Sequence, residues 1–169
     1  MKCSVGVIAI LSVALMLGAC DRSADEERNL AMAERVFSEA WSKGNVDVLD
    51  ELLGDGYVKH WAANEPTVGR AAMKQAILDW RASVPDHNEE IVGMLATGDM
   101  VFVRWVETGT MHNDYLGVPA TGKHFKAAGM GWLRFEGGKI VEEWTSVDDW
   151  GTQVQLGVQY PESWVKPGW

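Results

Sequence analysis

The sequence has 169 residues, of which 47% are hydrophobic and 23% are charged, and its formal net charge is −9. These values are ordinary for one globular domain and argue against a disordered, collagen-like or disulfide-rich chain. Because the chain is acidic and has no cluster of lysine and arginine, we expect no nucleic-acid partner, which would need a basic face.

The N-terminus has the pattern of a bacterial signal peptide. Lys2 supplies a positive charge, and the uncharged, mostly apolar run over residues 4–17 is short for a membrane span. The run ends in Leu17-Gly18-Ala19-Cys20, which resembles a lipobox, the motif at which bacterial lipoproteins are cleaved and lipidated. A plain cleavage site and an uncleaved anchor are the alternatives.

The lipobox interpretation divides the chain into four parts: a signal peptide over 1–19, a lipid-anchored tether over 20–27, a domain over 28–157 and a C-terminal tail over 158–169. Cys20 is then the lipidated first residue of an exported protein anchored in a membrane, on the periplasmic or cell-surface side. Loss of Lys2 changes the formal charge from −9 to −10. The other cysteine, Cys3, lies in the signal peptide, so none remains in the domain for a disulfide, a metal site or a nucleophile.

Helical periodicity dominates the first part of the domain. One apolar stripe predicts an amphipathic helix over residues 28–43, and its members are Leu30, Ala33, Phe37, Ala40 and Trp41. A short helix over 45–53 and an extended piece over 57–61 follow. A third helix is predicted over 70–84, because Pro85 cannot continue it.

From residue 89 the period changes to two, which is typical of strands. Strands are predicted over 89–97, 100–111, 123–135 and 139–149, with tight turns at Gly98-Asp99 and Gly137-Gly138 and a loop over 113–121. In the second strand Val101, Val103 and Trp105 point to one face. Helices followed by antiparallel strands predict an α+β fold, with helices on one face of a curved sheet and a conical pocket between them.

Several segments of this domain carry a family resemblance, and they occur in the order Gly44–Leu52, Tyr57–His60, Gly69–Lys74, Gly98–Trp105, Gly109–Thr110, Leu116–Lys123 and Phe135–Trp144, followed by Asp148. Together they resemble the SnoaL-like ester cyclase (polyketide cyclase) family over about residues 28–157. The resemblance implies the nuclear transport factor 2-like (NTF2-like) fold, a cone of curved antiparallel sheet around N-terminal helices with an internal pocket. It leaves open a homodimer formed through the sheet.

The same resemblance implies a chemistry. Family members of known activity cyclise polyketide esters by an intramolecular aldol step, without metal or cofactor, using a side-chain acid/base assisted by a histidine. This sequence departs from that pattern, because His112 stands one residue after the position where relatives have a histidine, and such a shift in a strand reverses the face. Gly131 and Thr145 stand where relatives often carry aspartate.

Candidate site residues follow from parity and from the resemblance. Glu107 shares parity with Trp105 and Met111, and a carboxyl desolvated among them would have a raised pKa, as a general base requires. The candidate catalytic residues are His60, Glu107, His112 and Asp148. The candidate ligand-pocket residues are Trp61, Trp105, Met111, Tyr115, Trp132, Glu143 and Trp144. For each of these residues the alternative is a purely structural role, as a core or surface side chain. His87 and His124 are expected to face solvent.

Two functions from different classes fit the sequence. One is an enzyme that performs cofactor-free acid/base chemistry on a small hydrophobic carbonyl or ester. The other is a non-catalytic lipoprotein that holds a small hydrophobic molecule at the membrane surface. Nine tryptophans in 169 residues suit a flat, apolar ligand in either case.

Overall fold

The computed structural model describes residues 24–62 and 64–157. The predicted signal peptide, Cys20 and the tail over 158–169 therefore lie outside the described residues. The first helix already runs over residues 24–35, so it begins inside the predicted tether. No helix among the described residues combines the length and the apolarity that crossing a membrane requires.

A curved six-stranded sheet in the order β2-β1-β6-β5-β4-β3 forms one wall of the molecule. Its strands are β1 (Leu53–Trp61), β2 (Thr67–Val68), β3 (Asn88–Thr97), β4 (Met100–Thr110), β5 (His124–Glu136) and β6 (Lys139–Val147). Neighbouring strands are antiparallel except β1 and β6, which are parallel. The parallel pair departs from the all-antiparallel expectation, because a strand that follows the N-terminal helices joins the last strand of the chain.

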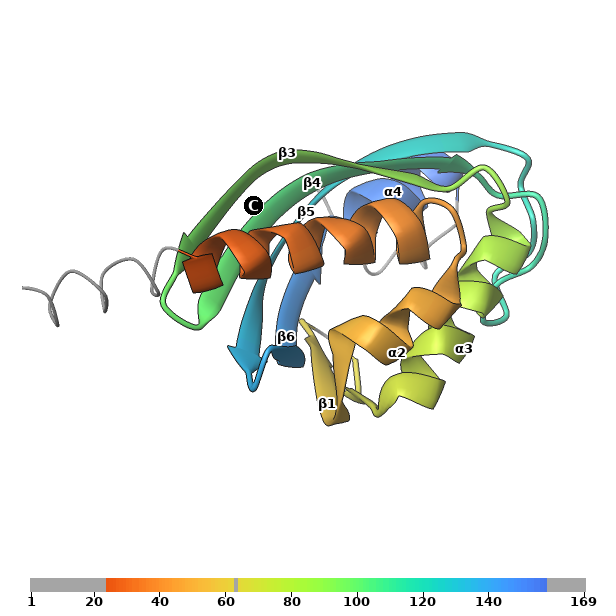
Figure 1. Ribbon diagram of the computed structural model, residues 1–169. Helices are drawn as coiled ribbons and strands as arrows, with labels where there is room; N and C mark the ends of the chain where they lie inside the picture. The colour runs from red at the N-terminus through yellow and green to blue at the C-terminus, as the bar shows by residue number, and fades with distance from the viewer. Residues whose placement is uncertain (1–23, 63, 158–169) are drawn as a thin grey trace, which may run out of the picture.

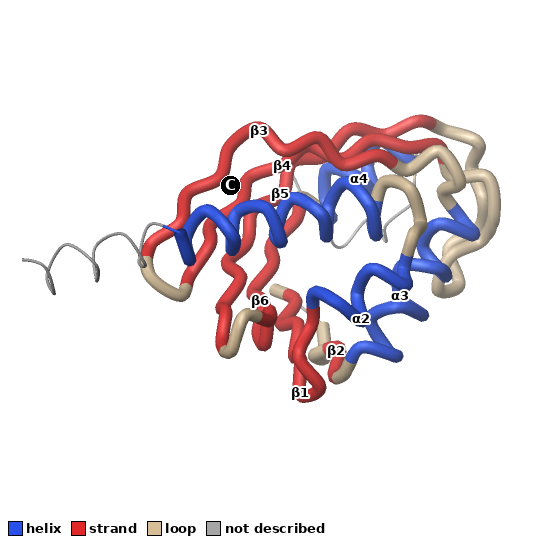
Figure 2. The backbone as a smooth tube through the Cα atoms, viewed as in Figure 1, coloured by secondary structure: helices blue, strands red, loops and turns tan. Residues whose placement is uncertain are grey.

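The helices cover the concave side of this sheet (Figure 1; Figure 2). The first helix continues into a π-helical turn η1 (Val36–Trp41), and it is followed by a 3₁₀ turn η2 (Val46–Val48), α2 (Leu49–Leu52) and α3 (Arg70–Ser83). A final helix, α4 (Asp149–Leu156), lies against β5 and was not predicted. The α+β class and the curved sheet with helices on one face are confirmed.

The strand alternation builds the core as predicted. Val101, Val103 and Trp105 of β4 are buried, and the Trp105 ring packs against Phe37 of the first helix with ring centroids 5.0 Å apart. Trp105 lies over Gly129 of the neighbouring strand, where an added Cβ would come within 2.3 Å of the indole ring. This glycine is therefore required by the close approach of a large ring.

Arg81 of α3 fixes the junction between the first helix and β3. Its guanidinium donates to the carbonyl oxygens of Trp41 (2.9 Å), Ser42 (2.8 Å) and His87 (3.0 Å). A cation at the C-terminal end of a helix satisfies carbonyls that have no partner within the helix. The Glu89 backbone N–H donates to Ser42 Oγ at 2.9 Å, so the start of β3 is held at the same junction.

Candidate active site

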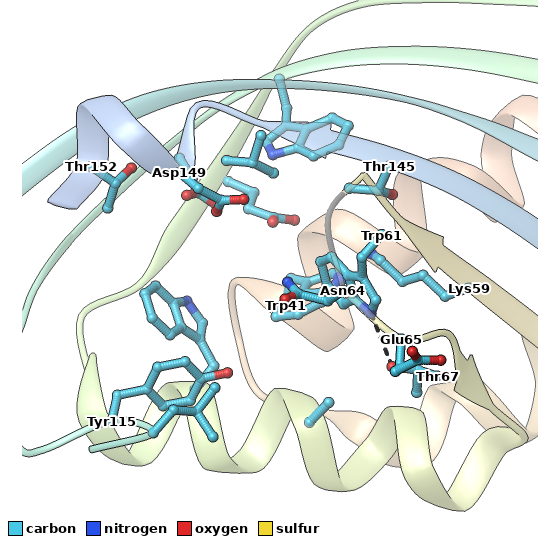
Figure 3. A pocket seen from close by; sticks show the side chains of 17 residues that line it. Trp41, Lys59, Trp61, Asn64, Glu65, Thr67, Tyr115, Thr145, Asp149 and Thr152 are labelled. Atoms are coloured by element: carbon cyan, nitrogen blue, oxygen red, sulfur yellow. Dashed lines mark hydrogen bonds between the residues drawn. The ribbon is translucent and has the colours of Figure 1, made fainter. Parts of the chain in front are cut away.

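A cavity of about 450 Å³ lies between the concave face of the sheet and the helices (Figure 3). Its aromatic lining consists of Trp41, Trp61, Trp80, Trp105 and Tyr115. Its polar lining includes Lys59, Glu89, Glu107, Thr145, Asp149 and Thr152. A wall that combines large aromatic rings with several polar groups suits a site for a small molecule.

Glu89 and Glu107 are opposed carboxyls on neighbouring strands of the cavity wall. They are directly paired between β3 and β4, and both side chains are largely buried. Burial raises the pKa of Glu89 to about 8, with Lys59 acting to lower the pKa and Glu143 to raise it. Burial and then the neighbouring Glu89 raise the pKa of Glu107 to about 7. Because two close carboxylates repel each other, the pair binds a proton near neutral pH.

His87 is the third titratable group at this end of the cavity, and it is buried. Its Nδ1 accepts a hydrogen bond from the Trp80 indole N–H at 3.0 Å, and its Nε2 lies 3.6 Å from Glu89 Oε1. Burial lowers the pKa of His87 to about 4, so the ring is neutral at pH 7. An indole can only donate, so the neutral ring carries its proton on Nε2, which is directed at the carboxyls.

The potential ligand atoms of His87, Glu89 and Glu107 lie within 4.8 Å of one another, a spacing that a metal ion could bridge. The donor chemistry does not fit one. A ligating Nε2 must be free of its proton, and Nδ1 already accepts from Trp80, so the ring would have to become an imidazolate or lose that hydrogen bond. An ion would also have to displace the proton that the carboxyl pair binds. We therefore interpret the three groups as a proton-sharing cluster.

A buried ion pair stands on β1 and β6. Lys59 Nζ donates to Glu143 Oε1 at 2.7 Å, Thr145 Oγ1 donates to the same oxygen at 2.6 Å, and the Tyr57 hydroxyl donates to Oε2 at 2.6 Å. Burial works to raise the pKa of the Glu143 carboxyl, but the Lys59 ammonium and these three hydrogen bonds hold the pKa below its usual value. Glu143 is thus an ionised carboxylate, and both of its oxygens accept hydrogen bonds.

Comparison of the chain with known proteins identifies its family. The model of SnoaL-like polyketide cyclases matches residues 31–156. The chain belongs to this family. It is 32% identical over 139 residues to aklanonic acid methyl ester cyclase DauD of Streptomyces sp. (strain C5), an alignment that covers 77% of this chain and 84% of DauD.

Solved structures agree with this assignment. The structure of IdmH from Streptomyces antibioticus is 29% identical, with a TM-score of 0.67, over 77% of this chain and 99% of IdmH. A SnoaL-like structure from Jannaschia sp. CCS1 has a TM-score of 0.74 at 20% identity, over 80% of this chain and 95% of that one, and supports the fold alone. The expected NTF2-like cone is therefore confirmed.

Four of the predicted site residues lie on the cavity wall of this SnoaL-like protein. Trp105 and Glu107 reach it from β4, Trp61 from β1 and Tyr115 from the loop that follows β4. Figure 3 shows Tyr115 beside α3, and Trp61 and Lys59 close together near Thr145. Glu143 lies behind this wall, bonded to Lys59 and Thr145, which do line the cavity.

Three predicted residues lie on the opposite, outer face of the sheet. Trp132 and Trp144 are 44% and 37% exposed, and the ring of His60 stacks on Trp144 with centroids 5.3 Å apart. His60 Nε2 also lies 2.9 Å from Glu142 Oε1. The prediction that these three side chains line the internal pocket was wrong. Side chains alternate between the two faces of a strand, and it is the neighbouring residues, such as Lys59 and Gly131, that face inward. His60, Trp132 and Trp144 border only a shallow hollow of about 290 Å³ on the outer face.

The remaining three predicted residues lie outside the cavity lining for local reasons. Met111 is buried in a separate apolar cluster with Val84 and Phe125. His112 is exposed beyond the end of β4. Asp148 caps α4, where its side chain accepts a hydrogen bond from the Gly151 N–H at 2.8 Å, so its neighbour Asp149 lines the cavity instead.

Sequence reasoning missed most polar groups of the site, among them Lys59, His87 and Glu89. Lys59 shares parity with Tyr57 and Trp61, and that alternation could have placed it inside. His87 was expected to face solvent and is buried, because Trp80 and Trp41 pack their ring edges against it. Glu89 opposes Glu107 only because of a register shift between Ile91 and Gly93.

Proposed function

We propose that this SnoaL-like protein binds a flat, apolar molecule with a carbonyl or ester group and moves a proton on it with Glu107, without a cofactor. The observation that carries the proposal is a mostly buried carboxyl in an aromatic cavity whose pKa is raised to about 7 by burial and by Glu89. A general base acts best when its pKa lies near the working pH.

The proposed step is proton abstraction next to the carbonyl. The Glu107 carboxylate takes a proton from the carbon beside the carbonyl group, and the electron pair moves to the carbonyl oxygen to give an enolate. The enolate carbon then bonds to a second carbonyl carbon of the same molecule, and Glu107 returns its proton to the new alkoxide. Return of the proton to another carbon instead would give an isomerisation. DauD is named as a methyl ester cyclase, which supports the ring-closing form.

Packing around Gly131 explains one departure from the family pattern. At Gly131, where relatives often carry aspartate, an added Cβ would lie 2.8 Å from the Trp144 carbonyl oxygen, and the Trp105 ring is 3.6 Å away. No side chain fits there without movement. In this protein the acid/base role is therefore assigned to the next strand, at Glu107.

Exchange of the α-protons of 2-tetralone, a flat apolar ketone, tests the proposal. In D₂O near pH 7.5 we expect the protein to accelerate loss of the α-proton NMR signals, and Glu107→Gln to lower that rate by about 10²-fold or more, the usual contribution of a general base. Glu90→Gln is the matched control, because Glu90 is exposed. Equal rates for the wild-type and Glu107→Gln proteins would contradict the proposal.

A non-catalytic binding function is the second candidate. It is favoured by the position of His60, His112 and Asp148, which all lie outside the cavity lining. It predicts that a flat apolar ligand quenches tryptophan fluorescence in a saturable manner and is recovered chemically unchanged. Recovery of a converted product would reject it in favour of the enzyme.

We also propose that the protein is exported and anchored to a membrane through Cys20. The support is the sequence Leu17-Gly18-Ala19-Cys20 after a short apolar run. The cavity would then meet ligands outside the cytoplasm.

A further inference from the structure

Among the described residues that line the cavity, Lys59 is the only lysine or arginine. Its side chain is 3% exposed and reaches the wall from β1 beside Trp61 (Figure 3). It opposes an acidic set, because the lining also holds Glu65, Glu89, Glu107 and Asp149. An anion or a partly negative oxygen in this cavity therefore has one cationic partner on the wall.

Glu143 holds this ammonium in place. Its two oxygens accept from Lys59, Thr145 and Tyr57, so the carboxylate is occupied and serves as an anchor. A buried ion pair is weak evidence for stability, because well-packed apolar residues often replace such a pair at no loss. The Lys59 ammonium of this pair lines the cavity, where its charge is available to a ligand.

The ammonium retains donor capacity toward the cavity. It has three N–H groups, and within the described part of the chain Glu143 is the one acceptor of a hydrogen bond from it. Nζ lies 4.3 Å from the centroid of the Trp61 ring and 5.2 Å from that of Trp41, so two indole faces stabilise and confine it. A ligand oxygen can complete its coordination.

We propose that Lys59 is a further catalytic residue, whose ammonium hydrogen-bonds the carbonyl oxygen of the substrate and stabilises the negative charge that develops there. This inference rests on the proposed function. When Glu107 takes the α-proton, the electron pair moves to the carbonyl oxygen, and the Lys59 N–H groups donate to that oxygen without transferring a proton. Preorganised donors aimed at developing charge are commonly the largest single contribution to catalysis.

Lys59, Glu89 and Glu107 line the same cavity. Lys59 acts to lower the pKa of both Glu89 and Glu107, against the dominant effect of burial. Because Glu107 and Lys59 both line this cavity, one ligand can contact the base and the cation. The substrate class follows: a flat apolar molecule whose enolisable carbon stands next to a carbonyl oxygen, with the carbon toward Glu107 and the oxygen toward Lys59.

Binding of 4-nitrophenol, whose phenolate resembles a planar enolate, tests the role of Lys59 apart from turnover. The full-length Glu107→Gln protein is used, so that Glu107 cannot exchange a proton with the probe. We expect the visible absorbance of the bound probe to show a pKa below that of free 4-nitrophenol by about one unit or more, equivalent to tenfold preference for the phenolate. An unchanged or raised probe pKa overturns the proposal.

Adding Lys59→Met to the Glu107→Gln protein should abolish the preference for phenolate. The affinity for uncharged nitrobenzene should stay within about twofold of that of the Glu107→Gln protein. Because Lys59→Met alone leaves Glu143 unpaired in the interior, Lys59→Met with Glu143→Gln is made as well, and the same result is expected. Lys74→Met is the control, since Lys74 pairs with Asp47 and Asp50 away from the lining. Full phenolate preference in a folded Lys59 variant overturns the proposal.

The two proposals fail separately. A phenolate preference that depends on Lys59, combined with 2-tetralone exchange that is unaffected by Glu107→Gln, would contradict Glu107 as the base and support an anion site at Lys59. Exchange that depends on Glu107, combined with an unshifted probe pKa, would support Glu107 as the base and contradict the proposed role of Lys59.

Discussion

At the scale of single residues, hydrogen-bond partners distinguish the buried Glu143, behind the cavity wall, from Glu89 and Glu107 on it. Glu143 accepts three hydrogen bonds and stays a carboxylate, whereas Glu107 and Glu89 lack such donors, and burial raises their pKa values. Glu89 Oε2 is buried without a hydrogen-bond partner among the described residues. A carboxyl in this condition favours its neutral form, because desolvation penalises the charge.

The raised pKa of Glu89 predicts how stability depends on pH. The folded pKa of about 8 exceeds the ordinary 4.5, so the folded state keeps a proton that the unfolded state releases. The stabilisation is complete below pH 4.5 and is lost as the pH rises through 8. Measured by urea unfolding, the free energy of unfolding of Glu89→Gln should therefore fall less than that of wild type between pH 6.5 and 8.5. The difference grows by up to about 1.4 kcal/mol for each pH unit below the folded pKa.

This pH window avoids the opposite effect of His87. Its pKa falls from 6.5 to about 4 on burial, so its contribution to stability is lost as the pH falls below 6.5. Glu90→Gln, on the exposed face, should leave the wild-type slope unchanged. Identical slopes for the wild-type and Glu89→Gln proteins would contradict a protonated Glu89 in the folded state.

At the scale of elements, periodicity predicted the strands and the inward face of β4, but it could not predict the register. A two-residue turn that pairs Thr97 with Met100 would place Glu90 opposite Glu107 if the ladder were regular. The shift between Ile91 and Gly93 inserts one residue, so Glu89 occupies that position. The acidic pair at the centre of the site therefore depends on a bulge that the alternation does not reveal.

On β1, β5 and β6, the alternation of side chains likewise could not predict which face of the sheet lines the cavity. The sequence shows that His60 and Lys59 point to opposite faces, but which face is concave is decided by the helices that cover the sheet. His60, Trp132 and Trp144 were assigned to the wrong side for this reason. The helix α4 was missed because it is short, and its position against β5 is a tertiary contact.

Contact between β4 and β5 gives a prediction for Gly129. Gly129→Ala should lower the free energy of unfolding by about 1–3 kcal/mol, as overpacking does, because the new Cβ would come within 2.3 Å of the Trp105 ring. Gly93→Ala in β3 is the matched control, since an added Cβ there meets no atom within 4 Å. Thermal unfolding of both variants measures the difference, and equal melting temperatures would contradict the close packing.

At the scale of the whole molecule, the sequence was sufficient for the family and the cone, but not for the composition of the cavity. The segments over 28–157 carried the resemblance, and the family match over 31–156 agrees with it. Residues of η1, β1, β2, β3, β4, β6, α3 and α4 line the cavity together with the loop after β4. Such a set is defined only once the sheet has curved, so Lys59 and Glu89 were not among the predicted residues.

The proposed membrane anchor is a property of the whole chain and has its own test. Cys20→Ser should move the protein from the membrane fraction to the soluble fraction and block its lipidation, because each buried CH₂ of an acyl chain contributes about 0.8 kcal/mol to membrane binding. Cys3→Ser, inside the predicted signal peptide, is the control and should leave both unchanged. Equal membrane association and processing of the Cys20→Ser protein would contradict the anchor.

Burial keeps a proton on the Glu89–Glu107 pair near neutral pH, and the site depends on this proton. The most direct measurement is a carboxyl ¹³C NMR titration of protein labelled at the glutamate side chains, with Glu89→Gln and Glu107→Gln used for assignment. We expect two resonances to titrate around pH 7 and 8, and each Gln variant to remove one of them. If both carboxyls instead titrate near the ordinary 4.5, the pair is ionised at neutral pH and the account is contradicted.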